Sequence, residues 1–164
     1  MKPFKFSLFV FLMGMTFYNN GYSQSELKWG EFDERASVAA KEKKYIFVEF
    51  YADWCSYCKM MDETTLVHKD VVKELKENFV VVKINTESKE KLYWDGRSIS
   101  METFSAMMGV ESLPTMVFLN SKQEVVGSHA SFVDAKTLLA LLTYISSGAR
   151  ERNESLDEFL RGKN

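Results

Sequence analysis

Apolar residues occur along the chain in runs whose spacing changes between helical and extended. Between residues 29 and 43, apolar positions recur with charged residues between them, which is typical of an amphipathic helix. These positions are Phe32, Ala36, Ala39 and Ala40. Residues 45–51 then form an almost unbroken apolar run, the pattern of a buried strand. The pattern therefore predicts a helix that leads into a central strand.

The middle of the chain repeats these two patterns. The predicted elements are a helix over 55–63 that is interrupted near Thr64 and Thr65, its continuation over 69–78, a buried strand over 79–84, a polar loop over 86–99 with a turn at Asp95-Gly96, and a short helix over 100–108 that ends at Gly109. A strand, a helix and a second strand in this order favour a parallel pair joined by a crossover helix.

The last third predicts a β-hairpin and a final helix. Strands over 116–119 and 124–128 flank a polar turn, and Asp134 is predicted to cap a helix that ends near Gly148. Together these elements predict an α/β fold, a central mixed β-sheet with helices on both faces, as one domain over 24–148. The charged tail over 149–164 is either a short docking helix or a frayed end.

The first segment differs from the rest of the chain. Lys2 and Lys5 precede an apolar stretch over 6–17, and small residues follow at Gly21 and Ser23. This order predicts a secretory signal peptide over 1–23 and a periplasmic or secreted mature protein. The alternative is an uncleaved anchor, but a bilayer-spanning helix needs about 20 apolar residues.

Composition and charge limit the function further. The 164 residues carry 21 basic and 23 acidic side chains, a net charge of −2. Neither sign forms a long block, so the sequence gives no indication of nucleic-acid binding or of attraction to an anionic membrane. The methionines at 60, 61, 107 and 108 are interpreted as core residues rather than as metal ligands.

The chain has two cysteines, Cys55 and Cys58, directly after the first predicted strand. Cys55 falls in the first turn of the next helix, where unpaired backbone N–H groups and the helix dipole stabilise a thiolate. Cys58 lies one turn later on the same face, within reach of a disulfide. We therefore expect Cys55 to be the exposed attacking sulfur and Cys58 the recessed partner.

Three other interpretations of the cysteine pair are less favoured. A structural disulfide closing so short a loop contributes only about 2 kcal/mol in the chain-entropy model. A zinc site would need His68 and His129, which lack the usual ligand spacing. Two inert reduced thiols are not expected in an oxidising compartment. A redox-active pair is favoured over these, and no metal site is predicted.

The residues around the cysteines resemble a known family. Residues 48–59, VEFYADWCSYCK, resemble the strand and active-site turn of the thioredoxin superfamily, and Leu113-Pro114-Thr115 resemble its second signature, a cis-proline facing the cysteines. The similarity covers about 32–145. Within the superfamily it is strongest to secreted thioredoxin-related proteins and to the C-terminal domain of the thiol:disulfide interchange protein DsbD, which act as reductants.

The resemblance implies roles for particular residues. Glu49 matches a buried acid that shuttles a proton for the second cysteine, Lys83 matches the lysine that pairs with it, and Asp62 is a possible second carboxylate. The alternative for Glu49 is a solvated strand edge. A substrate-binding rim is expected from Trp54, Ser56, Tyr57, Leu113, Pro114 and Thr115, with Phe132 beside it.

The sequence also departs from the family pattern. Ser56-Tyr57 replace the common Gly-Pro between the cysteines, and Ser112 and Ala130-Ser131 stand where glycines are usual. The resemblance implies a disulfide reductase that needs no cofactor, with disulfide-bearing proteins as substrates and a membrane dithiol as electron donor. A monomer is expected. The alternatives are an oxidase or isomerase, or a peptide-binding module without catalysis.

Overall fold

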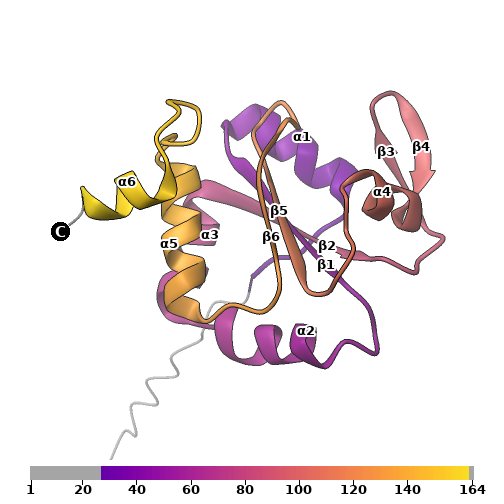
Figure 1. Cartoon of the computed structure of the whole chain (residues 1–164). Coiled ribbons are helices and arrows are strands. Elements are labelled where there is room, and N and C mark those ends of the chain that lie inside the picture. Colours follow the sequence, from indigo (N-terminus) through magenta and orange to yellow (C-terminus); the bar gives the residue numbers. More distant parts are fainter. Residues whose placement is uncertain (1–26, 163–164) are drawn as a thin grey trace, which may run out of the picture.

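A four-stranded mixed sheet forms the centre of the computed structural model, which describes residues 27–162 (Figure 1). Its strands lie in the order β2 (Phe79–Asn85), β1 (Tyr45–Tyr51), β5 (Thr115–Leu119) and β6 (Val125–Ala130). The β1–β2 pair is parallel, and the β1–β5 and β5–β6 pairs are antiparallel. The predicted fold class is therefore confirmed. The predicted signal peptide over 1–23 lies outside the described residues.

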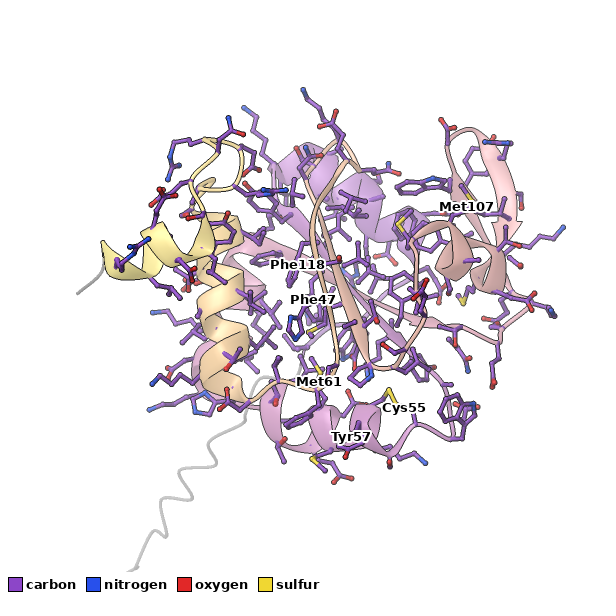
Figure 2. The ribbon with its side chains drawn as sticks, viewed as in Figure 1. Phe47, Cys55, Tyr57, Met61, Met107 and Phe118 are labelled. Carbon is purple, nitrogen blue, oxygen red and sulfur yellow. A yellow bond between two sulfur atoms is a disulfide. The ribbon has the colours of Figure 1, made fainter. Side chains whose placement is uncertain are left out.

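Helices cover both faces of this sheet. The helices are α1 (Phe32–Glu42), α2 (Ser56–Met60), the π-helical turn η1 (Met61–Thr65), α3 (Lys69–Asn78), α4 (Met101–Met107), α5 (Ala135–Ser146) and α6 (Leu156–Arg161). Because side chains alternate along a strand, β1 contributes to two separate cores. Phe47 packs with residues of α3 and α5, whereas Ile46 and Val48 pack with residues of α1 and α4. Figure 2 shows Phe47 and Phe118 between the sheet and α5.

The predicted elements agree with the structure except in one segment. The first strand has the predicted bounds, and Asp134 caps α5 by accepting a hydrogen bond from the Thr137 N–H at 2.8 Å. Residues 86–99, predicted as a loop, instead contain the hairpin of β3 (Lys91–Trp94) and β4 (Arg97–Ser100). The loop prediction was wrong because β3 has only two inward apolar side chains, Leu92 and Trp94, which are too few to reveal an alternating pattern.

Two inward side chains hold this hairpin. Leu92 is buried, and the Trp94 ring lies 5.6 Å from Phe32 and 5.0 Å from Phe104. At the turn, Asp95 and Gly96 both have positive φ, 49° and 74°, as a two-residue hairpin turn requires. The turn was therefore predicted correctly although the strands beside it were not.

The tail contains a helix that docks on the domain. Ser155 and Glu158 form a capping box at the start of α6, and Phe159 packs with its ring 5.5 Å from Tyr144. Of the two alternatives for the tail, the docking helix is confirmed. No helix within residues 27–162 has the length and apolar character needed to cross a bilayer.

Candidate functional site

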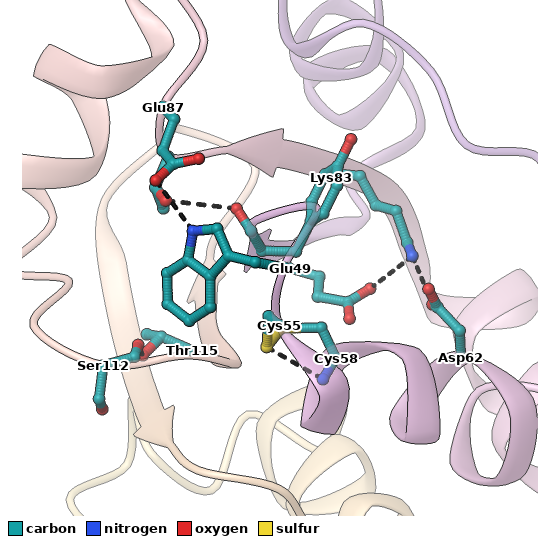
Figure 3. The surroundings of a disulfide bond; sticks show 11 residues. Glu49, Cys55, Cys58, Asp62, Lys83, Glu87, Ser112 and Thr115 are labelled. Carbon is teal, nitrogen blue, oxygen red and sulfur yellow. Dashed lines mark hydrogen bonds and ion pairs between the residues drawn. A yellow bond between two sulfur atoms is a disulfide. The ribbon is translucent and has the colours of Figure 1, made fainter.

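The two cysteines form a disulfide at the end of β1, where α2 begins (Figure 3). Their Cα atoms are 5.3 Å apart. Cys55 is the N-cap residue of α2, and its Sγ accepts a hydrogen bond from the Cys58 N–H at 3.1 Å. The helix start therefore places one sulfur against the unpaired N–H groups of the first turn, as the sequence predicted.

The expected difference in exposure between the cysteines is absent from this disulfide form. Cys55 is 3% exposed and Cys58 is 2% exposed. The prediction of an exposed Cys55 was wrong for this state, because its Sγ is turned inward onto the Cys58 N–H and bonded to the Cys58 sulfur.

A buried carboxylate lies on β1 beside the disulfide. Glu49 is 0% exposed, which contradicts the alternative of a solvated edge, because β2 and β5 pair with β1 on both sides. Lys83 is its neighbour in the parallel β1–β2 register, with Nζ 3.3 Å from Glu49 Oε2. That contact lacks hydrogen-bond geometry, and neither carboxylate oxygen has a hydrogen-bond partner among the described residues.

Asp62 competes with Glu49 for the same lysine. It lies on η1 and accepts a hydrogen bond from Lys83 Nζ, so one ammonium serves two carboxylates (Figure 3). Burial raises the pKa of Glu49 from 4.5 to about 7, Lys83 opposes this rise, and the charge of Asp62 adds to it. The structure thus brings together the three charged residues that the sequence proposed, and Glu49 is poised to exchange a proton near neutral pH.

The loop over 112–115, which contains Pro114, lies on the side of the disulfide away from Glu49 (Figure 3). The Leu113–Pro114 peptide bond is cis, the isomer expected from the sequence. Thr115 Oγ1 donates to the Ser112 carbonyl at 2.7 Å, and the Ser131 N–H donates to the Pro114 carbonyl at 2.8 Å. Ser131 has φ 106°, a conformation that favours glycine.

Aromatic side chains stand around the disulfide. Trp54 is 68% exposed and Tyr57 is 57% exposed, and the Tyr57 ring lies 6.4 Å from Phe132. Figure 2 shows Tyr57 pointing outward from α2. Leu113 is half-buried and Ser56 is exposed. These four side chains are at least partly exposed. Pro114 and Thr115, which the sequence also assigned to the rim, are buried, so their side chains offer no contact surface; both lie where the chain enters β5 in the centre of the sheet.

Sequence reasoning missed one residue at this rim. Trp54 Nε1 donates to Glu87 Oε1 at 2.9 Å, and Glu87 lies in the loop after β2 (Figure 3). The Glu87 N–H donates to Asn85 Oδ1, which fixes the turn that presents the carboxylate. Glu87 belongs to no motif, and a contact 33 residues away along the chain leaves no local signal.

The methionines that the sequence assigned to the core differ in their burial. Met61 is buried as predicted, but Met60 and Met107 are exposed, so their assignment to the core was wrong. They lie on the outer sides of the short helices α2 and α4, which bury few residues. Within residues 27–162, no group of three or more His, Cys, Asp or Glu side chains is placed to hold a metal ion.

Comparisons with known proteins agree with this geometry. A family model described as a thioredoxin-like domain matches residues 32–146. Thioredoxin-1 of Drosophila melanogaster is 30% identical over 103 residues, which cover 63% of this chain and 78% of that protein. A thioredoxin from Thermus thermophilus has a similar structure, with a TM-score of 0.63 and 21% identity over 79% of this chain and 94% of the other.

A second solved structure carries the resemblance noted in the sequence. The oxidised C-terminal domain of DsbD from Neisseria meningitidis has a TM-score of 0.52 and 22% identity, covering 66% of this chain and 87% of that domain. These structural likenesses show the fold. The chain also matches disulfide isomerases of Arabidopsis thaliana and Oryza sativa. The matched region covers only 14% to 18% of the length of those proteins.

Proposed function

We propose that this chain, which belongs to the thioredoxin-like family of thiol–disulfide oxidoreductases, reduces disulfide bonds in exported proteins. One observation carries the proposal. The Cys55–Cys58 disulfide caps a helix start while the fully buried Glu49 occupies the strand that leads to it. In this arrangement the cysteine pair can carry two electrons, and Glu49 can accept or donate a proton.

The reaction begins from the reduced dithiol. The Cys55 thiolate attacks one sulfur of a substrate disulfide, which forms a mixed disulfide and releases the other substrate sulfur as a thiolate that takes up a proton. Cys58 then loses its proton and attacks the Cys55 sulfur. The mixed disulfide breaks, the second substrate thiol leaves, and the Cys55–Cys58 disulfide forms. Two electrons pass from the chain to the substrate, and an external dithiol returns them.

Glu49 is the proposed proton acceptor for Cys58. A base is most effective when its pKa lies close to the working pH, and burial raises the pKa of Glu49 to about 7. Lys83 stabilises the charge that Glu49 acquires, at an Nζ–Oε2 distance of 3.3 Å. Replacing Glu49 by glutamine is expected to slow resolution of the mixed disulfide while the first attack by Cys55 changes little.

The surface and the sequence support a proposal for the substrate and for the electron donor. The exposed rings of Trp54 and Tyr57 favour an extended polypeptide held across the disulfide, with the Leu113 backbone on the other side. The predicted signal peptide supports a proposed location in the periplasm or outside the cell, where a membrane dithiol is the proposed electron donor. Cell fractionation, with mass spectrometry of the mature N-terminus, tests this location.

The direction of electron flow is tested by the reduction potential of the Cys55–Cys58 couple. Equilibration with glutathione is expected to give a value nearer the roughly −270 mV of thioredoxin than the roughly −120 mV of a strong oxidant. A value above about −150 mV would support the oxidase alternative. A variant with both cysteines replaced by serine tests the alternative of a peptide-binding module without catalysis. Such a module would keep its affinity for its partner.

A further inference from the structure

A tryptophan from the segment before α1 covers the charged cluster beside the disulfide. The Nζ atom of Lys83 lies 4.9 Å from the centre of the Trp29 ring. The Trp29 ring also lies 6.4 Å from the ring of Phe47. Phe47 and Glu49 are two residues apart on β1, so their side chains emerge on the same face of the sheet. Trp29 therefore spans the border between the hydrophobic core and the Glu49–Lys83 ion pair.

The Lys83 ammonium is surrounded by partners from several elements. The Glu49 carboxylate and the Tyr51 ring, 5.4 Å from Nζ, come from β1, and the Asp62 carboxylate comes from η1. Only 22% of the lysine side chain remains exposed. Trp29 is thus the partner that comes from outside the elements building the redox centre. The face of an indole attracts a cation and also excludes water from it.

We propose that Trp29 is a positioning residue of the redox centre, which holds the Lys83 ammonium against Glu49 and Asp62 and keeps bulk water away from the Glu49 carboxylate. The inference rests on the proposed function, in which Glu49 accepts the Cys58 proton. Trp29 acts through Lys83 and Glu49 by setting the environment in which the proton moves.

The direction of the effect follows from the forces on Glu49. The charged neighbours of Glu49 are Lys83 and Asp62, but burial has the largest influence on its ionisation. Removing the indole admits water to the cluster, which stabilises the carboxylate and makes Glu49 ionise at lower pH. Lys83 also loses a ring face, which weakens its hold on Glu49 and acts in the opposite direction. Because burial dominates, the net change is towards the ordinary carboxyl range.

The experiment is a titration of the Glu49 carboxyl by carbon-13 NMR in the oxidised full-length chain. Glu49→Gln identifies the signal by its disappearance. Trp29→Ala removes the cover, and Trp29→Phe keeps an aromatic face over Lys83. Trp94→Ala is the matched control, because Trp94 is also a half-buried tryptophan but packs against Phe104 in the other core.

The titration midpoint of Glu49 is expected to fall by about one pH unit or more in Trp29→Ala, and by less than about 0.3 in Trp29→Phe and Trp94→Ala. An unchanged midpoint in Trp29→Ala, or an equal shift in Trp94→Ala, would overturn the proposal. If Trp29→Ala does not fold, Trp29→Thr, whose small polar side chain also leaves the cluster open to water, is judged by the same criterion.

A second measurement separates this inference from the proposed function. The rate at which reduced protein resolves its mixed disulfide with insulin is followed against pH, and the profile of Trp29→Ala is expected to shift to lower pH in parallel with the titration. If the wild type shows no exchange with insulin, the proposed function fails. The Glu49 titration still decides whether Trp29 controls the cluster, because it needs no catalytic turnover.

Discussion

Replacing Glu49 by glutamine tests the electrostatics of the redox centre through the stability of the fold. In the folded protein, burial raises the pKa of Glu49 from 4.5 to about 7, although Lys83 opposes the rise. In the unfolded chain the same carboxyl is in water and ionises in its ordinary range. Between these two pKa values the folded state binds a proton that the unfolded state has lost.

The free energy of unfolding therefore depends on pH in a defined direction. Below the unfolded pKa the carboxyl is neutral in both states, and the contribution of Glu49 to stability is fully present. As pH rises from 4.5 towards about 7, the carboxyl ionises in the unfolded chain but stays protonated in the folded protein. The free energy of unfolding therefore falls over this range. A difference between 4.5 and about 7 corresponds to a loss of about 3 kcal/mol. Glutamine does not ionise and escapes this loss.

Urea unfolding of the oxidised protein measures the effect. The unfolding free energy of Glu49→Gln minus that of the wild type is expected to rise by about 3 kcal/mol between about pH 4.5 and pH 8. Glu63→Gln, which removes an exposed carboxylate from the π-helical turn that carries Asp62, is the control and should follow the wild-type curve. Parallel curves for Glu49→Gln and the wild type would refute the argument that Glu49 is held in an environment that favours its neutral form.

Three further substitutions test the backbone, a buried hydrogen bond and the packing of the fold, each by urea unfolding at neutral pH. Ser131→Gly is expected to stabilise the protein by about 1 kcal/mol, because φ 106° strains any residue with a Cβ; a loss of stability would contradict this. Thr65→Val should cost about 1–3 kcal/mol, since it removes the 2.8 Å hydrogen bond to the buried Val133 carbonyl, whereas Thr65→Ser should largely retain stability. Phe159→Ala should cost about 3 kcal/mol and expose α6 to proteolysis, unless its packing on Tyr144 contributes nothing.

The sequence predicted the parts of the fold in which local patterning and tertiary packing agree. The first strand follows four charged residues and is apolar on both faces except at Glu49, so its start and its central position followed from the sequence pattern alone. The start of α5 was predicted from Asp134, a residue type that commonly caps helices. The hairpin over 91–100 was missed because Leu92 and Trp94 are stabilised by Phe32 and Phe104, which are distant in the sequence.

The candidate site divides in the same way. Cys55 and Cys58 lie three residues apart directly after a predicted strand, and this local pattern favours redox chemistry. Glu49 and Lys83 lie on different strands, and their pairing came from the family resemblance rather than from spacing. Glu87 and Trp29 belong to no motif, and their contacts with Trp54 and Lys83 exist only once the chain is folded. Residues that act by covering or orienting others therefore require the structure.

The burial of Glu49 separates a functional interpretation of the site from a purely structural one. A short disulfide would strengthen the fold equally well beside an apolar residue, and an apolar side chain at position 49 would avoid the cost of burying a carboxyl without hydrogen bonds. Lys83 does not remove that cost, because it hydrogen-bonds to Asp62 and only approaches Glu49. A structural role for the cysteines thus leaves Glu49 unexplained. The proposed proton transfer to and from Cys58 gives Glu49 a task, because a base is most effective when it ionises close to the working pH.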